Sequence, residues 1–148
     1  MTAEQFLLQS VRIREKLRNI YERKMKLEAD LGYHPKQLDD SGASKGTMTD
    51  KTTDTLAEIV DLESEWEKMR FSLERKNNEI RQELERLDNV EYIAVLTERY
   101  ITENTVRPCR LNSWVAVAFK LGLPNEDSAR MMKNRALKAF EKKFKSVR

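Results

Sequence analysis

Basic side chains are concentrated in the last 20 residues of the chain. Residues 129 to 148 carry eight Lys and Arg residues and a single acid, Glu141. Because each Lys or Arg that meets a phosphate releases a condensed counterion, this concentration is typical of nucleic-acid binding. A solvated helix face near a helix C-terminus produces the same composition, since cations there interact favourably with the helix dipole. Both interpretations predict a helix.

The spacing of residues in this segment separates two faces of the predicted helix. The inner face is small and apolar, and it consists of Ala129, Met132, Ala136 and Phe140. The outer face consists of Asp127, Arg130, Met131, Asn134 and Lys138. Its side chains suit the major groove, where Arg contacts guanine, Asn contacts adenine and Met contacts the thymine methyl group. A helix that merely packs on a small core explains the inner face equally well, but it gives no reason for a basic outer face.

Further cations are candidates for contacts with DNA, and Lys142, Lys143 and Lys145 are better placed for phosphate. Arg135, Lys142 and Lys143 belong to the same predicted helix, whereas Arg107 and Arg110 belong to a basic loop that precedes it. Phosphate contacts position a protein on the duplex without selecting its sequence. We therefore expect base selection from the outer face and sequence-independent attraction from these flanking cations.

Short helices are predicted before this helix. A helix is predicted from 114 to 121, and Gly122 suits the left-handed residue that ends it. The turn at residues 123 to 125 leads into the last helix, which we expect to end near Phe144. Another helix is predicted from about 90 to 101. A short helix, a glycine-containing turn and a basic helix are the parts of a helix-turn-helix.

Residues 1 to 89 have the pattern of a long antiparallel helical hairpin. Apolar residues follow a heptad frame from Ala3 to Leu31 and again from Thr53 to Leu87, which is typical of coiled-coil-like helices. The polar segment from 32 to 53 between them is predicted to be a mobile loop. Because two helices alone make a thin core, we expect packing on the C-terminal module or a homodimer.

Polar residues interrupt both heptad frames. Ser10 and Lys24 interrupt the first, and Glu63, Arg70 and Asn77 interrupt the second. Glu63, Arg70 and Asn77, which are seven residues apart, can fix the register or the number of partners. Alternatively, the apolar face turns away from the frame at these points.

Composition and cysteine content exclude several classes of protein. Charged residues make up 36% of the chain, while Gly and Pro number only four and three, which favours an all-α fold. Cys109 and His34 cannot complete a zinc site, so we expect no metal or cofactor. The Gly42–Gly46 segment matches a nucleophile-elbow pattern, but it lies in a polar loop, without the strand, helix and His partner that the elbow needs. We therefore expect no enzymatic activity.

Neither a membrane span nor a signal peptide is predicted. The longest apolar run, from Trp114 to Phe119, is far shorter than the roughly 20 residues that a span needs. The N-terminus has no basic segment followed by an apolar stretch. Adsorption of the last helix to an anionic membrane is disfavoured because Ala and Met anchor a helix poorly. We expect a soluble, cytoplasmic chain.

Three short segments resemble the C-terminal region-4 module of sigma-70-type factors. They are Arg-Tyr-Ile at 99–101, Trp-Val-Ala-Val-Ala-Phe-Lys-Leu-Gly at 114–122 and Arg-Ala-Leu at 135–137. The layout of the whole chain is similar to that of small phage proteins of the ArpU-type or RinA-type transcriptional regulators. This resemblance implies a phage-encoded or prophage-encoded regulator that binds double-stranded DNA and contacts RNA polymerase.

Two functional hypotheses remain. In the first, residues 90 to 148 form the sigma-region-4-like module that binds promoter DNA, and residues 1 to 89 oligomerise or contact RNA polymerase. In the second, the chain is a helical adaptor between proteins, and a degenerate helix-turn-helix only packs. The first hypothesis predicts duplex binding that weakens steeply with salt, and the second predicts none.

Overall fold

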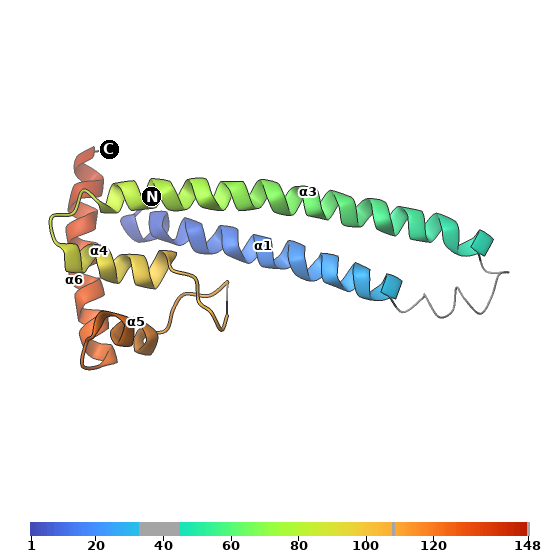
Figure 1. The fold of residues 1–148 in the computed structure, drawn as a ribbon. Helices are drawn as coiled ribbons and strands as arrows, with labels where there is room; N and C mark the ends of the chain where they lie inside the picture. The colour runs from blue at the N-terminus through green and yellow to red at the C-terminus, as the bar shows by residue number, and fades with distance from the viewer. Residues whose placement is uncertain (33–44, 108, 148) are drawn as a thin grey trace. The chain divides into compact units, whose positions relative to one another are not determined.

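The computed structural model describes residues 1–32, 45–107 and 109–147. The fold is all-α, as predicted, with a long antiparallel pair followed by shorter packed helices (Figure 1). The helical elements in the described residues are α1 (Ala3–Gly32), α3 (Lys45–Leu84), α4 (Val90–Leu96), the π-helical turn η2 (Thr97–Ile101), α5 (Trp114–Leu121) and α6 (Glu126–Val147). Among these residues, no helix combines the length and the apolarity that a membrane span requires.

The second long helix begins earlier than predicted. We expected it to start at Thr53, but α3 starts at Lys45, so residues 45–53 of the predicted mobile loop are helical. Gly46 and the Thr residues of this stretch have low helix propensity, which is why the pattern indicated a loop. The rest of the predicted loop, residues 33–44, lies outside the described residues.

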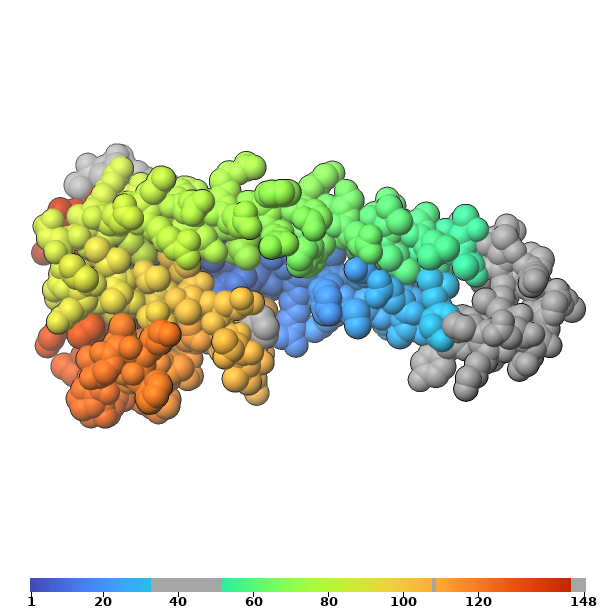
Figure 2. Space-filling model, in the orientation of Figure 1, coloured from blue at the N-terminus to red at the C-terminus, as the bar shows by residue number. Residues whose placement is uncertain are grey.

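The chain divides into two compact units. Unit 1 comprises residues 1–15 and 72–148, and unit 2 comprises residues 16–71. In unit 2, α1 and α3 lie side by side (Figure 2). Unit 1 contains the first half of α1, the last part of α3 and all of the shorter helices. The sequence instead predicts a domain boundary between residues 89 and 90. The functional division into 1–89 and 90–148 stays a prediction.

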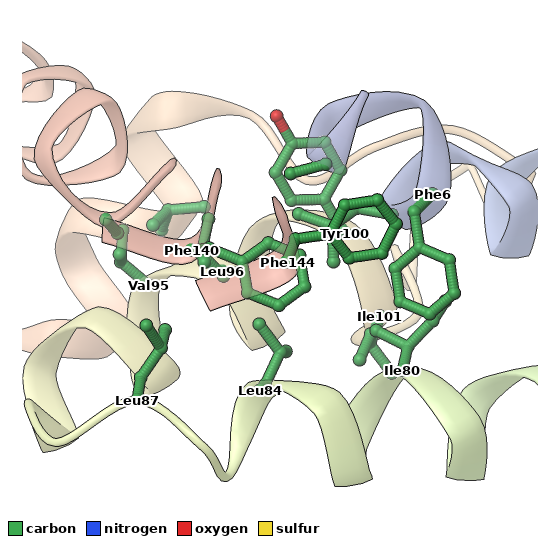
Figure 3. Close-up of a cluster of buried hydrophobic side chains, with 14 of the residues drawn as sticks. Phe6, Ile80, Leu84, Leu87, Val95, Leu96, Tyr100, Ile101, Phe140 and Phe144 are labelled. Atoms are coloured by element: carbon green, nitrogen blue, oxygen red, sulfur yellow. The ribbon is translucent and has the colours of Figure 1, made fainter. Parts of the chain in front are cut away.

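Aromatic residues from the two ends of the chain form the centre of unit 1. The ring centroid of Phe6 lies 6.3 Å from that of Phe140 and 5.3 Å from that of Phe144. Ile80 and Leu84 from the last turns of α3 pack into the same cluster and are fully buried (Figure 3). Because large aromatic side chains bury the most apolar area, this contact anchors α6 to the start of α1.

Two of the three polar residues that interrupt the second heptad frame meet polar residues of the first. In unit 1, Ser10 Oγ donates a hydrogen bond to Asn77 Oδ1 at 2.5 Å. In unit 2, Lys24 Nζ lies 3.1 Å from Glu63 Oε1. Each pair satisfies both partners in one alignment of the two helices, which supports the interpretation that Asn77 and Glu63 fix the register.

A buried arginine and a buried tyrosine tie α1 to the π-helical turn. The guanidinium of Arg14 donates to the Tyr100 carbonyl oxygen at 2.5 Å, and Tyr100 Oη donates to Glu4 Oε1 at 3.0 Å. Burial lowers the pKa of Arg14, and burial together with the bond to Glu4 raises the pKa of Tyr100 above its usual range. These contacts hold η2 against the first half of α1.

Candidate nucleic-acid interface

Local hydrogen bonds define both ends of α5. Ser113 Oγ accepts a hydrogen bond from the Ala116 amide at 3.2 Å and caps the helix. Gly122 ends it in the left-handed region with φ of 67°. The Leu123 amide then donates to the Ala118 carbonyl oxygen at 2.8 Å, which closes the helix end. The predicted helix and its glycine-containing turn are confirmed.

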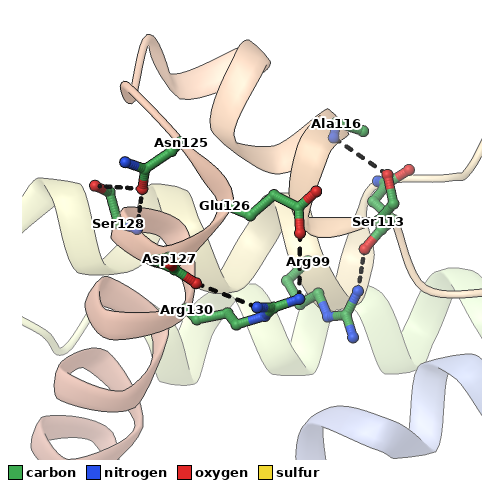
Figure 4. Close-up of polar contacts among 9 residues, drawn as sticks. Arg99, Ser113, Ala116, Asn125, Glu126, Asp127, Ser128 and Arg130 are labelled. Atoms are coloured by element: carbon green, nitrogen blue, oxygen red, sulfur yellow. Dashed lines mark hydrogen bonds and ion pairs between the residues drawn. The ribbon is translucent and has the colours of Figure 1, made fainter.

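The start of α6 is fixed by a cap that we did not single out from the sequence. Asn125 Oδ1 accepts hydrogen bonds from the Ser128 amide at 2.9 Å and from Ser128 Oγ at 3.1 Å (Figure 4). Asn directly before a first turn that contains Glu126 and Asp127 is a recognisable capping signal. Gly122 and Asn125 thus bracket the turn between α5 and α6. The helix ends at Val147, three residues beyond the predicted end at Phe144.

The two predicted faces of α6 differ in burial as expected. Ala129 and Ala136 are fully buried, Phe140 is 1% exposed, and Met132 is partly buried against the same cluster. The small side chains of Ala129 and Ala136 let the helix pack closely on its neighbours. The outer face is exposed at Asp127, Arg130, Met131, Asn134 and Lys138. Their exposure is confirmed, and their contact with DNA stays a prediction.

Arg130 is held by acidic neighbours on its own helix. Its guanidinium lies 3.2 Å from Glu126 Oε2 and 3.3 Å from Asp127 Oδ1 (Figure 4). All three side chains are at least 46% exposed, so water weakens both ion pairs. Spacings of three and four residues on a helix indicate such pairs, and our sequence interpretation overlooked them. A contact between Arg130 and a base would compete with these two ion pairs.

Three cations surround the indole ring of Trp114 at the start of α5. Arg99 Cζ lies 4.1 Å from the ring centroid, Lys133 Nζ lies 5.4 Å from it, and Arg130 Cζ lies 6.0 Å from it. Burial lowers the pKa of Arg99, and the positive charge of Arg130 acts in the same direction. The cluster joins residues of η2, α5 and α6, so no local sequence pattern indicated it.

A basic groove lies between α4 and α6. It has a volume of about 490 Å³ and is lined by Tyr92, Arg135, Lys138, Ala139, Lys142 and Lys143. Four residues predicted as DNA contacts are therefore brought together. Lys143 is partly engaged, because its ammonium lies 3.7 Å from a carboxylate oxygen of the exposed Asp88. Tyr92 was missed because its contribution depends on how α4 packs against α6.

The other two predicted cations lie on the loop between η2 and α5. The Arg107 amide donates to Asn104 Oδ1 at 3.0 Å, and the Arg110 amide donates to the Arg107 carbonyl oxygen at 2.9 Å. Both side chains are exposed, and neither lines the basic groove. The structure does not join them to the cations of α6.

No cluster of three His, Cys, Asp or Glu side chains suited to a metal ion occurs among the residues that the structure describes. Comparison with protein-family models, with curated proteins and with solved structures gives no match to this chain.

Proposed function

We propose that this chain is a DNA-binding transcription regulator in which α6 enters the major groove. One observation carries the proposal: α6 exposes side chains suited to base edges directly opposite an inner face of Ala and Phe. Asn134 and Lys138 lie on the exposed face, whereas Ala136 and Phe140 are buried. A capped helix and a turn with a left-handed glycine precede it, an arrangement that is common in helix-turn-helix motifs.

Cations on both sides of the exposed face support this orientation. On the α4 side, Arg135 and Lys142 line the basic groove, and Lys138 belongs to both the groove and the outer face. On the α5 side, Arg99 and Lys133 lie over Trp114. A helix in the major groove has a phosphate backbone on each side, and two flanking groups of cations fit that environment.

The assignment to transcription rests on the resemblance of residues 99–101, 114–122 and 135–137 to sigma region 4, which also supports contact with RNA polymerase. The similarity of the whole chain's layout to ArpU-type and RinA-type regulators supports a phage or prophage source. The chain then acts in the cytoplasm on double-stranded DNA, by binding rather than by catalysis, and no step of this function needs a cofactor.

Selection from a pool of random duplexes tests the proposal, with the full chain and several salt concentrations. We expect enrichment of a defined sequence, and fluorescence anisotropy should show affinity falling with salt. Contacts from the four groove cations alone predict a slope of about −4 in log affinity against log salt. Absence of enrichment together with absence of binding at low salt would contradict the proposal.

An adaptor function is the second candidate, because α5 exposes two apolar side chains one turn apart. Phe119 is 87% exposed and Val115 is 58% exposed. Such a pair suits a hydrophobic partner protein. This candidate predicts that the chain binds no duplex DNA under the conditions of the selection.

A further inference from the structure

Unit 2 leaves its large apolar side chains largely uncovered. Among its described residues, the apolar side chains that are buried are Ile20, Ile59 and Leu62. The exposed ones, each at least 46% exposed, are Tyr21, Met25, Leu56, Val60 and Phe71. Since helices gain most of their stability by packing an apolar face, two helices with this pattern need a cover.

The exposed side chains share one face across both helices. Tyr21 of α1 and Val60 of α3 line the same depression, which has a volume of about 460 Å³. Met25 follows Tyr21 by one turn, Leu56 precedes Val60 by one turn, and Phe71 follows Val60 by three turns. Because the two helices are antiparallel, Met25 and Leu56 extend the face in the same direction. We refer to these five residues as the apolar strip.

The lining of the depression is apolar in part. Ile20 and Trp66 contribute to it, and Arg70 lies over the Trp66 ring at 5.6 Å. Three charged residues also line it, of which Lys24 and Glu63 pair with each other at 3.1 Å and the third is Glu67. An incoming side chain therefore meets apolar surface, one ion pair and one acidic side chain.

The net charges of the two helical segments that carry the strip indicate which occupant fits. In unit 2, the α1 segment from 16 to 32 carries five basic and three acidic residues, a net charge of +2. The α3 segment from 52 to 71 carries two basic and six acidic residues, a net charge of −4. The two segments already attract each other within the chain, where Arg23 Nη2 lies 2.6 Å from Glu58 Oε1. A surface that is basic on one helix and acidic on the other is complementary to its own copy after a two-fold rotation.

We propose that the apolar strip binds the same strip of a second copy of this chain. In this dimer, α1 of each copy faces α3 of the other, which forms a four-helix bundle. The apolar side chains of both strips are then buried, and each basic segment faces an acidic one. This interface does not depend on DNA binding, so either proposal can fail without the other.

Sedimentation velocity of the full chain tests the dimer, from about 1 to 200 μM. We expect a monomer–dimer equilibrium with a midpoint in the micromolar range, which is typical of modest interfaces. Val60→Glu should raise the dissociation constant at least tenfold. The matched control is Val106→Glu, which makes the same change at a valine that is 84% exposed in unit 1. This control should leave the equilibrium unchanged.

A second variant and a salt series complete the test. Met25→Gln adds no charge and should weaken the dimer less than Val60→Glu does, while circular dichroism confirms that both variants remain helical at equal concentration. Raising the salt concentration from 0.05 to 0.5 M should weaken the dimer several-fold, because opposite charges face each other. The proposal would be overturned if the chain is a monomer up to 200 μM, or if neither strip variant changes the dissociation constant of the dimer. A dimer that strengthens with salt would overturn the pairing of α1 with α3.

Discussion

Arg130 illustrates how the environment of one side chain sets its availability for binding. Its guanidinium is shared between Glu126 and Asp127, both on the exposed face of α6. These carboxylates neutralise Arg130 in the free protein and also repel phosphates. Base contact by Arg130 therefore competes with two weak ion pairs, each worth less than about 1 kcal/mol at this exposure.

Removal of one carboxylate should strengthen DNA binding. We predict that Glu126→Gln raises affinity for the selected duplex about two- to fivefold at low salt. The substitution removes a negative charge and one of the two ion pairs of Arg130. Fluorescence anisotropy measures the change. Glu65→Gln, the same substitution at an exposed position of unit 2, serves as the control and should have no effect. Weaker binding by Glu126→Gln would show that the carboxylate itself contributes to recognition.

Tyr100 predicts how stability changes at alkaline pH. Burial and the hydrogen bond to Glu4 raise its pKa, so folding favours the neutral phenol. Its contribution is fully present below the ordinary pKa of about 10 and is lost as pH rises towards the higher pKa of the folded state. Urea denaturation should show a free energy of unfolding that falls above pH 10. Tyr100→Phe should lower it by about 1 kcal/mol at pH 8 but reduce the alkaline decline. An equal decline in both proteins would assign it to other groups.

At the scale of elements, the turn between α5 and α6 depends on a single glycine. Gly122 has φ of 67°, and a Cβ added there meets no atom within 4 Å. A substitution therefore acts through backbone strain and not through a clash. We predict that Gly122→Ala lowers the free energy of unfolding by about 1 kcal/mol.

Gly32 provides the matched control for this prediction, because it also has open space around its Cβ but lacks a positive φ. Gly32→Ala, at the last residue of α1, should leave urea denaturation almost unchanged. If both substitutions destabilise the protein equally, the left-handed conformation is not the cause.

Local patterns predicted the elements whose signals lie within a few residues. The capped start of α5, its end at Gly122 and the two faces of α6 follow from capping and from helical periodicity. The π-helical turn η2 was not predicted, because it is held by a residue far away in the sequence. Arg14 donates a hydrogen bond to the Tyr100 carbonyl oxygen of this turn. The basic groove was predicted only in part, since Tyr92 enters it through packing of α4.

At the scale of the whole molecule, the boundary of the compact unit depends on contacts between distant residues. The heptad frame of residues 3–31 has apolar residues on both sides of residue 15, at Ile13 and Leu17, so it gives no sign that the first segment of unit 1 ends there. Phe6 and Phe144 are near opposite ends of the chain, yet their rings are 5.3 Å apart. No pairwise signal in a single sequence reveals such a contact, and a periodic pattern alone suggests that the hairpin is separate.

This core has a consequence for fragments of the chain. A fragment of residues 90–148 would expose Phe140 and Phe144, which are otherwise buried with Phe6 and Leu84. We predict that it lacks the cooperative thermal unfolding of the full chain when followed by circular dichroism. Cooperative unfolding of the fragment at a similar temperature would show that the C-terminal helices need no support from α1 and α3.

In the proposed function, α6 selects DNA sequence through its outer face and attracts phosphates through its flanks. Comparison of Asn134→Ala with Lys142→Ala on the selected duplex and on unrelated duplexes tests it most directly, with Lys68→Ala in unit 2 as the control. Asn134→Ala should cost about 1–3 kcal/mol on the selected site alone and relax preference at one base pair, whereas Lys142→Ala should weaken all duplexes similarly and reduce the salt slope by about one. If Asn134→Ala lowers the affinity for all duplexes equally and leaves the site preference intact, α6 does not select sequence through Asn134. That result would contradict the proposed function.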